Sequence, residues 1–174
     1  DLGGLKENKG DDHILRAFQL FLKVKCGIKV VDPRRFIKDS LADKGVMTAR
    51  GLTATEQKDV CFGWKIAGGI GKLDIGQTVV VKNGVVLAVE ALEGTDEAIR
   101  RAGALAGDGV VVVKVSKPNQ DLKFDLPCVG PATIETLKSV SSRVIAVEAG
   151  KTLLINKKEL IALADRENIT ILGA

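Results

Sequence analysis

The sequence has 174 residues and a mass of 18.4 kDa, which is enough for one domain, or for one domain with part of another. Apolar residues make up 45% of the chain and charged residues 28%, so a buried core is expected and intrinsic disorder is not. Lysine and arginine number 26 against 22 acidic residues, and this net charge of +4 is too small for a dedicated DNA-binding protein.

Residues 1–45 are expected to contain a helix, a short buried strand and a second helix. The helix is capped by Asp11 or Asp12, carries Ile14, Phe18, Phe21 and Leu22 on one face, and stops at Gly27. The predicted elements are the helix to about Lys25, the strand over Ile28–Val31, and a helix opened by Asp32-Pro33 and running to about Leu41. Because these elements lack the further strands of a sheet, residues 1–45 are interpreted as the remnant of an N-terminal α/β domain with its linker.

The same part of the sequence is locally basic. Only Asp32 opposes a set of basic residues, namely Arg16, Lys23, Lys25, Lys29, Arg34, Arg35 and Lys38. One interpretation is a solvent-exposed face beside a core, and the other is a surface for phosphate or for anionic lipid headgroups.

Residues 46–174 are expected to form an α/β domain with a mixed sheet and helices packed on it. Thr53 or Thr55 caps a first helix, which is expected to end at Gly68, Gly69 and Gly71. Asn83-Gly84 is the pair that a type I′ turn favours, and it predicts a hairpin between two short apolar runs. The predicted hairpin strands are Thr78–Lys82 and Val85–Val89.

The rest of this domain alternates helices and strands. Val110–Val115 is apolar at every position but Lys114, which is typical of a central strand. The other predicted elements are a helix from Asp96 to about Leu105, a helix from Gly130-Pro131 to about Ser139, strands over Val144–Val147, Leu153–Ile155 and Ile169–Leu172, and a helix from Lys157 to about Arg166.

Scarce residue types restrict the chemistry. His13 is the single histidine, so a histidine-rich metal site is excluded, and no GxSxG elbow accompanies it. Cys26, Cys61 and Cys128 form no CxxC pair, which argues against structural zinc and a disulfide framework and suits a reducing cytoplasm. The few aromatic residues argue against a base-stacking nucleic-acid surface, and no apolar run reaches the length of a membrane span.

Three segments carry candidate site residues, and each also has a purely structural interpretation. Thr95 is a natural helix N-cap that could leave amides free for an anion, with Asp96 next to it in the first turn. Lys114, Lys117 and Gln120 lie beyond the carboxyl end of the central strand, where α/β sheets place ligands, although lysines there are often only solubilising. Asp125 precedes a helix N-terminus, where a carboxylate could coordinate magnesium or orient a water, or simply form a turn.

One glycine-rich segment is excluded as a nucleotide site. Gly68-Gly69-Ile70-Gly71-Lys72 lacks the first glycine of the Walker pattern and has Leu73 after the lysine instead of Ser or Thr.

Several motifs in one order resemble a known family. They are Lys9-Gly10-Asp11-Asp12, Gly71-Lys72-Leu73-Asp74-Ile75-Gly76-Gln77, Val86–Ala91, Glu93-Gly94-Thr95-Asp96, Lys114, Lys117-Pro118, Gln120, Asp125-Leu126-Pro127, Val129-Gly130 and Glu148-Ala149-Gly150. This pattern is similar to the LpxI-type UDP-2,3-diacylglucosamine pyrophosphatases of lipid A biosynthesis. Cys128 departs from it, since threonine is usual there.

The resemblance implies a magnesium-dependent hydrolase. It would split the diphosphate of UDP-2,3-diacylglucosamine into UMP and 2,3-diacylglucosamine 1-phosphate (lipid X). Asp125 matches the family's essential aspartate and is expected to be catalytic and, with Asp96, to hold Mg²⁺. The expected substrate-binding residues are Gln77, Gly94, Thr95, Lys114, Lys117 and Gln120.

The same resemblance implies a cytoplasmic protein without a nucleic-acid partner. Peripheral contact with the inner membrane fits the basic segment, and assembly into a homo-oligomer is compatible with the sequence. Two alternatives stay open, a non-catalytic module that binds a nucleotide or an acidic lipid, and a phosphohydrolase acting on a soluble nucleotide sugar.

Overall fold

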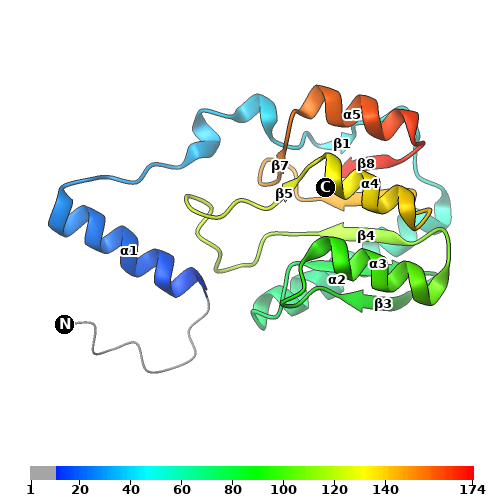
Figure 1. Cartoon of the computed structure of the whole chain (residues 1–174), viewed down its shortest axis with the longest axis horizontal. Coiled ribbons are helices and arrows are strands. Elements are labelled where there is room, and N and C mark those ends of the chain that lie inside the picture. Colours follow the sequence, from blue (N-terminus) through cyan, green and yellow to red (C-terminus); the bar gives the residue numbers. More distant parts are fainter. Residues whose placement is uncertain (1–10) are drawn as a thin grey trace.

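The computed structural model describes residues 11–174 (Figure 1). The motif that begins at Lys9-Gly10 lies partly outside these residues. The side chains of Asp11, Asp12 and His13 also lie outside the described part, so the predicted cap of the first helix is not tested.

A mixed six-stranded sheet forms the centre of the described structure, in the strand order β1-β8-β6-β4-β2-β3. Strands β4, β6 and β8 are parallel, while β2 pairs antiparallel with β4, β3 with β2, and β1 with β8. The predicted α/β class with a mixed sheet is therefore confirmed. The strands are β1 (Gly45–Val46), β2 (Thr78–Lys82), β3 (Val85–Val89), β4 (Val111–Lys114), β6 (Val144–Val147) and β8 (Thr170–Gly173). A separate parallel pair joins β5 (Cys128–Val129) to β7 (Leu153–Leu154).

The hairpin forms as predicted. Asn83 and Gly84 both have positive φ angles, 51° and 74°, as a type I′ turn requires. The buried carboxylate of Asp59 accepts hydrogen bonds from both turn amides, at 2.8 Å and 2.7 Å. The turn is thus stabilised by the preference of Asn-Gly for positive φ angles and by the hydrogen bonds of Asp59, which lies in the preceding helix.

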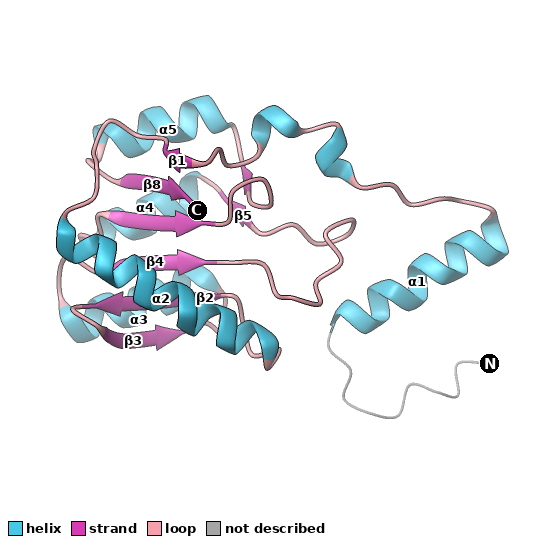
Figure 2. Cartoon of the chain, turned by 180° about the vertical axis from the view of Figure 1, so that it is seen from behind, coloured by secondary structure: helices cyan, strands magenta, loops and turns pink. Residues whose placement is uncertain are grey.

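Helices cover both faces of the sheet (Figures 1 and 2). On one face, α2 (Ala54–Lys72) packs on β2 and β4 through a core that includes Val79, Val111 and Val113. The other face packs against three helices, with Val80, Val112 and Ile145 in that core. These helices are α3 (Thr95–Ala106), α4 (Pro131–Ser139) and α5 (Lys157–Arg166). The period of two along each strand explains why neighbouring valines belong to different cores.

Helix α2 begins as predicted but ends later. Thr53 forms a capping box with Glu56, and the helix continues through Gly68, Gly69 and Gly71 to Lys72. The prediction that these glycines end the helix is wrong. Gly71 is buried against Pro118, so packing outweighs the cost of about 1 kcal/mol that each glycine carries in a helix.

Two of the elements predicted before residue 45 are absent. Helix α1 (Asp11–Cys26) forms and is followed by Gly27 with a φ of 67°. Ile28 and Val31 are 52% and 47% exposed and belong to no strand, so the predicted buried strand is wrong. Two short 3-10 helices, Pro33–Arg35 and Lys38–Ser40, replace the predicted continuous helix, and the Asp32 side chain caps the first of them.

Helix α1 lies apart from the sheet in Figure 1. Ile14, Phe18 and Phe21 are at least half exposed, so the apolar face predicted for this helix is not buried in the described structure. The amide of Gln19 approaches the loop after β4, donating to Asp121 Oδ2 at 3.2 Å and accepting from Lys123 Nζ at 3.0 Å. None of the described helices is long and apolar enough to span a membrane.

Candidate active site at the carboxyl edge of the sheet

Polar side chains gather at one edge of the sheet. The parallel strands β4 and β6 end there, β2 begins there, and β3 ends there because it is antiparallel to β2. This edge is where open α/β sheets place ligands. The strand directions therefore bring together the segments around Gln77, Glu90, Lys117 and Glu148, which lie far apart in the sequence.

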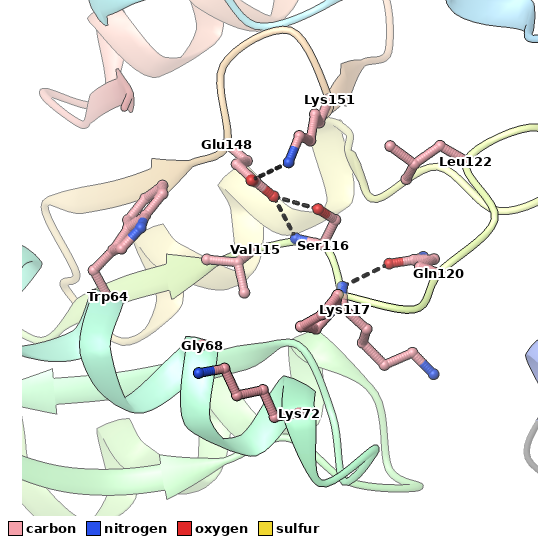
Figure 3. Close-up of a pocket in the computed structure, with 11 residues that line it drawn as sticks. Trp64, Gly68, Lys72, Val115, Ser116, Lys117, Gln120, Leu122, Glu148 and Lys151 are labelled. Atoms are coloured by element: carbon pink, nitrogen blue, oxygen red, sulfur yellow. Dashed lines mark hydrogen bonds and ion pairs between the residues drawn. The ribbon is translucent and has the colours of Figure 1, made fainter.

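In the described part of the chain, two cavities at this edge share Lys117 in their lining. The first, here called the acidic cavity, has a volume of about 390 Å³ and is lined by Asp74, Ile75, Gly76, Gln77, Glu90, Ala91, Leu92, Lys117 and Asp125. The second, here called the basic cavity, has a volume of about 360 Å³ and appears in Figure 3. Its lining residues are Trp64, Gly68, Lys72, Val115, Ser116, Lys117, Pro118, Gln120, Leu122, Glu148 and Lys151.

The loop after β4 places Asp125 in the acidic cavity. The Nε2 of buried Gln120 donates to Asp125 Oδ2 at 2.6 Å, and its Oε1 accepts from the backbone N–H of Lys117 at 2.9 Å. Gln120 therefore orients the Asp125 carboxylate. Lys117 Nζ reaches Asp74 Oδ1 at 2.7 Å, which brings a cation to the same cavity. Three predicted site residues, Lys117, Gln120 and Asp125, are thus in one place.

Thr95 and Lys114 belong to a buried network beside this cavity. Lys114 Nζ donates to Thr95 Oγ1 at 2.9 Å, and the Thr95 hydroxyl donates to Glu90 Oε1 at 2.8 Å. Lys114 is only 7% exposed and lines neither cavity. In this structure Thr95 and Lys114 hold Glu90 in position, and their predicted contact with substrate stays a prediction.

Helix α3 starts at Thr95, one residue earlier than the predicted start at Asp96. Gly94, with a φ of 84°, is the N-cap, and Thr95 is the first helical residue. The prediction that Thr95 caps the helix is wrong, because its hydroxyl is used by Glu90 and Lys114 instead. Gly94 and Asp96 line neither cavity, and Asp96 Oδ1 is buried without a hydrogen-bond partner among the described residues.

Glu148 connects the ends of β6 and β4 in the basic cavity (Figure 3). Its Oε2 accepts hydrogen bonds from the Ser116 backbone N–H at 2.8 Å and from the Ser116 hydroxyl, and its Oε1 accepts from Lys151 Nζ at 2.6 Å. Burial opposes ionisation of this carboxyl, but the hydrogen bonds from Lys151 and Ser116 outweigh it and hold the pKa of Glu148 below its ordinary value.

Sequence reasoning assigned no role to Asp74, Glu90 and Glu148. A signal existed for Glu90, because the alternation of β3 places it on the same side as buried Ala88, two residues earlier. Asp74 carried no such signal, because only tertiary contact brings its turn to Lys117. Glu148 could have been found from its position directly after a predicted strand.

The oxygen atoms of the side chains at the acidic cavity are of the kind that bind a hard cation such as Mg²⁺. Gln77 Oε1 and Glu90 Oε2 are buried oxygens without a hydrogen-bond partner in the described structure, and both residues line this cavity with Asp125. Mg²⁺ prefers oxygen ligands and often uses only one or two carboxylates, with water and phosphate completing its shell. No group of three or more Asp, Glu, His or Cys residues in the described part could hold a metal ion, so such a shell would need those other oxygens.

Comparison with known proteins gives a family match over nearly the same residues as the sheet and the helices packed on it. The family model described as the LpxI C-terminal domain matches residues 43–172. A curated relative, the UDP-2,3-diacylglucosamine pyrophosphatase LpxI of Caulobacter vibrioides, is 34% identical over 173 residues. The match covers 95% of this chain and 61% of that relative, so the chain spans about three fifths of the length of the relative.

Proposed function

Since the chain belongs to the LpxI family, we propose that it hydrolyses the diphosphate of UDP-2,3-diacylglucosamine in lipid A biosynthesis. The products would be UMP and 2,3-diacylglucosamine 1-phosphate. The observation that carries the proposal is the placement of Asp125 beside Gln120 and Lys117, at the sheet edge where the family motif and the cavities coincide.

Hydrolysis of a diphosphate needs cations that bind its phosphate oxygens and a group that orients the attacking water, and the two cavities would supply one each. Lys72, Lys117 and Lys151 line the basic cavity and would bind the phosphate oxygens, whose charge increases on attack. Asp125, held by Gln120, would orient a water for attack at phosphorus and accept its hydrogen bond. The water oxygen would bond to one phosphorus as the bond from that phosphorus to the bridging oxygen breaks. The other phosphate would leave with the bridging oxygen, and the proton of the water would pass to Asp125 and then to solvent.

Magnesium belongs to this proposal as the expected cofactor. When bound, Mg²⁺ supplies Lewis-acid polarisation of the phosphoryl oxygens and lowers the pKa of a water. Asp125 and the oxygens of Gln77 and Glu90 in the acidic cavity are the groups of this chain that fit such an ion. Asp96, which the sequence suggested as a second ligand, does not line the cavity.

The test is magnesium-dependent release of UMP from UDP-2,3-diacylglucosamine. Asp125→Ala should lower the rate by about 10²-fold or more, the usual effect of removing a group that positions a water or a metal, while far-UV circular dichroism stays unchanged. Asp108→Asn is the matched control, since Asp108 is an exposed aspartate at the opposite end of β4.

The Caulobacter relative serves as the positive control in the same assay. If that enzyme releases UMP and this chain does not, hydrolysis by this chain alone is disproved. Equal rates for the Asp125→Ala variant and the original chain would remove Asp125 from the mechanism.

We also propose cytoplasmic location with peripheral contact at an anionic membrane surface, where a diacylated substrate resides. Helix α1 supports this, because it exposes Phe18, Phe21 and Val24 beside the exposed cations Lys23 and Lys25. Vesicles containing phosphatidylglycerol should carry the chain upward in a flotation gradient at low salt, and vesicles of phosphatidylcholine should not. Absence of flotation with both kinds of vesicle would contradict this contact.

A further inference from the structure

The basic cavity combines cations with an apolar wall. Lys72, Lys117 and Lys151 line it against a single carboxylate, Glu148, so it attracts anions. The apolar residues that also line it are Trp64, Val115, Pro118 and Leu122. Phosphate needs no apolar wall, and an acyl chain needs no lysines. The lining therefore fits a small ligand that is anionic at one end and a flat, weakly polar ring at the other.

Helix α2 presents three of the lining residues in a row. Trp64, Gly68 and Lys72 are four residues apart, and residues at this spacing share one face of a helix. Figure 3 shows all three on α2, with Lys151 across the cavity from Lys72. At a rise of 1.5 Å per residue, Trp64 and Lys72 are about 12 Å apart along the helix axis. This face thus offers an aromatic ring at one end and a cation at the other.

Gly68 leaves open space between the ring and the cation. A Cβ added at Gly68 would have nothing within 4 Å. By contrast, a Cβ at Gly71 would lie 3.3 Å from Pro118 Cδ, in the loop after β4. The loop therefore closes on the end of α2 at Gly71, while the helix surface stays open one turn earlier.

Trp64 is only partly buried, although it adjoins the core of this face of the sheet. Val60 and Ala67 of the same helix are 3% and 0% exposed, and Trp64 packs against the core cluster that contains them. The rest of its side chain lines the basic cavity. Aromatic side chains stack on the π-face of any nucleobase, so one such ring is enough to hold one base.

We propose that Trp64 stacks on the base of a nucleotide whose phosphate groups are bound by the lysines of the basic cavity. Gly68 supplies the space that the nucleotide occupies between them. The proposal rests on the proposed function and deepens it, because it assigns recognition of the uracil end of the substrate to Trp64. Trp64 is then a specificity-determining residue that takes no part in the reaction at phosphorus.

Trp64 is the single tryptophan of the chain, so it reports on its own contact with a ligand. The experiment titrates the full chain with UMP in buffer containing Mg²⁺ and records tryptophan emission excited at a wavelength that uracil does not absorb. UMP should quench the emission to saturation. Ribose 5-phosphate, which has the sugar and phosphate but no base, should leave the emission unchanged and bind at least about 5-fold more weakly, because it lacks the stacking contact.

Variants of Trp64 are compared by calorimetric titration with UMP, which needs no fluorescence. Trp64→Leu should weaken UMP binding at least about 5-fold, and Trp64→Phe should retain most of the affinity because a ring remains. Lys65→Gln is the matched control for Lys72→Gln. Lys65 belongs to the same helix but lines a different hollow, with Cys61 and Phe62. Only Lys72→Gln should weaken UMP binding.

Gly68→Leu separates loss of the site from loss of the fold. Leucine is the better helix former, so this variant should unfold at the same or a higher urea concentration. Its side chain would fill the open space, and UMP binding should fall at least about 10-fold. UMP binding unchanged in both Gly68→Leu and Trp64→Leu would overturn the proposal. So would equal quenching by UMP and ribose 5-phosphate, or a response of Trp64 to lipid X and not to UMP, which would assign the ring to an acyl chain.

The result is independent of the hydrolase assay. Saturable quenching by UMP in a chain that does not hydrolyse UDP-2,3-diacylglucosamine would refute the proposed function and keep the base-stacking site. Hydrolysis by a chain whose Trp64 emission is indifferent to UMP would keep the proposed function and overturn the role of Trp64.

Discussion

Glu148 shows how one side chain can organise the sheet edge. It follows β6, yet its carboxylate holds Ser116 at the end of β4 and Lys151 in the next turn. Ser116 directly precedes Lys117, so this contact sets where the loop that carries Gln120 and Asp125 begins. Glu148 is in this sense a positioning residue for the candidate active site.

Glu148→Gln should reduce the free energy of unfolding by about 1–3 kcal/mol at pH 7, because hydrogen bonds to a charged acceptor are lost. The pKa of Glu148 lies below its ordinary value of 4.5 in the folded chain, so this stabilisation is complete above pH 4.5 and is lost as the pH falls through the lowered pKa. Urea unfolding of both chains from pH 7 to pH 3 should therefore show a difference that shrinks in acid. A difference that is constant over this range would contradict the assignment.

At the scale of elements, α2 illustrates how packing overrides local preference. Its glycines are unfavourable in a helix, but Gly63 lies so close to β4 that a Cβ would approach Val113 Cγ2 to 2.8 Å. Gly69, six residues later in the same helix, is exposed, and a Cβ added to it would have nothing within 4 Å. The two glycines have the same sequence signal and opposite surroundings.

Gly63→Ala should therefore destabilise the chain by about 1–3 kcal/mol, as overpacking does, although alanine is the better helix former. Gly69→Ala should stabilise it by about 0.5–1 kcal/mol through helix propensity alone. Urea denaturation of both variants measures the contrast. Shifts of the same sign in the two variants would show that propensity and not packing decides the stability of α2.

At the scale of the whole molecule, Leu41 is the first buried residue among those whose exposure is described. None of the earlier residues whose exposure is described is buried, and both clusters of core residues come from Ala42 onward. Helix α1 reaches the rest of the structure through the contacts of Gln19 with Asp121 and Lys123. The free energy of folding should therefore reside in the sheet and its four helices.

Deleting residues 1–37 should change the free energy of unfolding by no more than about 1 kcal/mol, since exposed polar contacts contribute little. A single cooperative urea transition with an unchanged midpoint would support this expectation. A broadened transition or a loss of folded signal would show that α1 stabilises the sheet.

The elements of residues 46–174 were largely predictable because their signals are local. Asn83-Gly84 selects its turn type, Pro131 starts α4, and the unbroken apolar run from Val79 to Val81 fits a strand packed on both faces. The prediction of a strand at Ile28–Val31 was wrong because it used only such a local signal. An apolar run forms a strand only where another strand is available to pair with it.

The sequence by itself determined most of the elements after residue 46, the α/β class and the family motifs, and it predicted a role for Asp125, because each depends on neighbouring residues or on a residue pattern. It did not predict the short strand β5 or the end of α2. Only the tertiary structure decided that Glu90 and Gln77 share the acidic cavity with Asp125, and that Thr95 supports Glu90 instead of capping α3. The physical reason is that burial, charge balance and missing hydrogen-bond partners arise from contacts between strands distant in sequence, which local spacing does not encode.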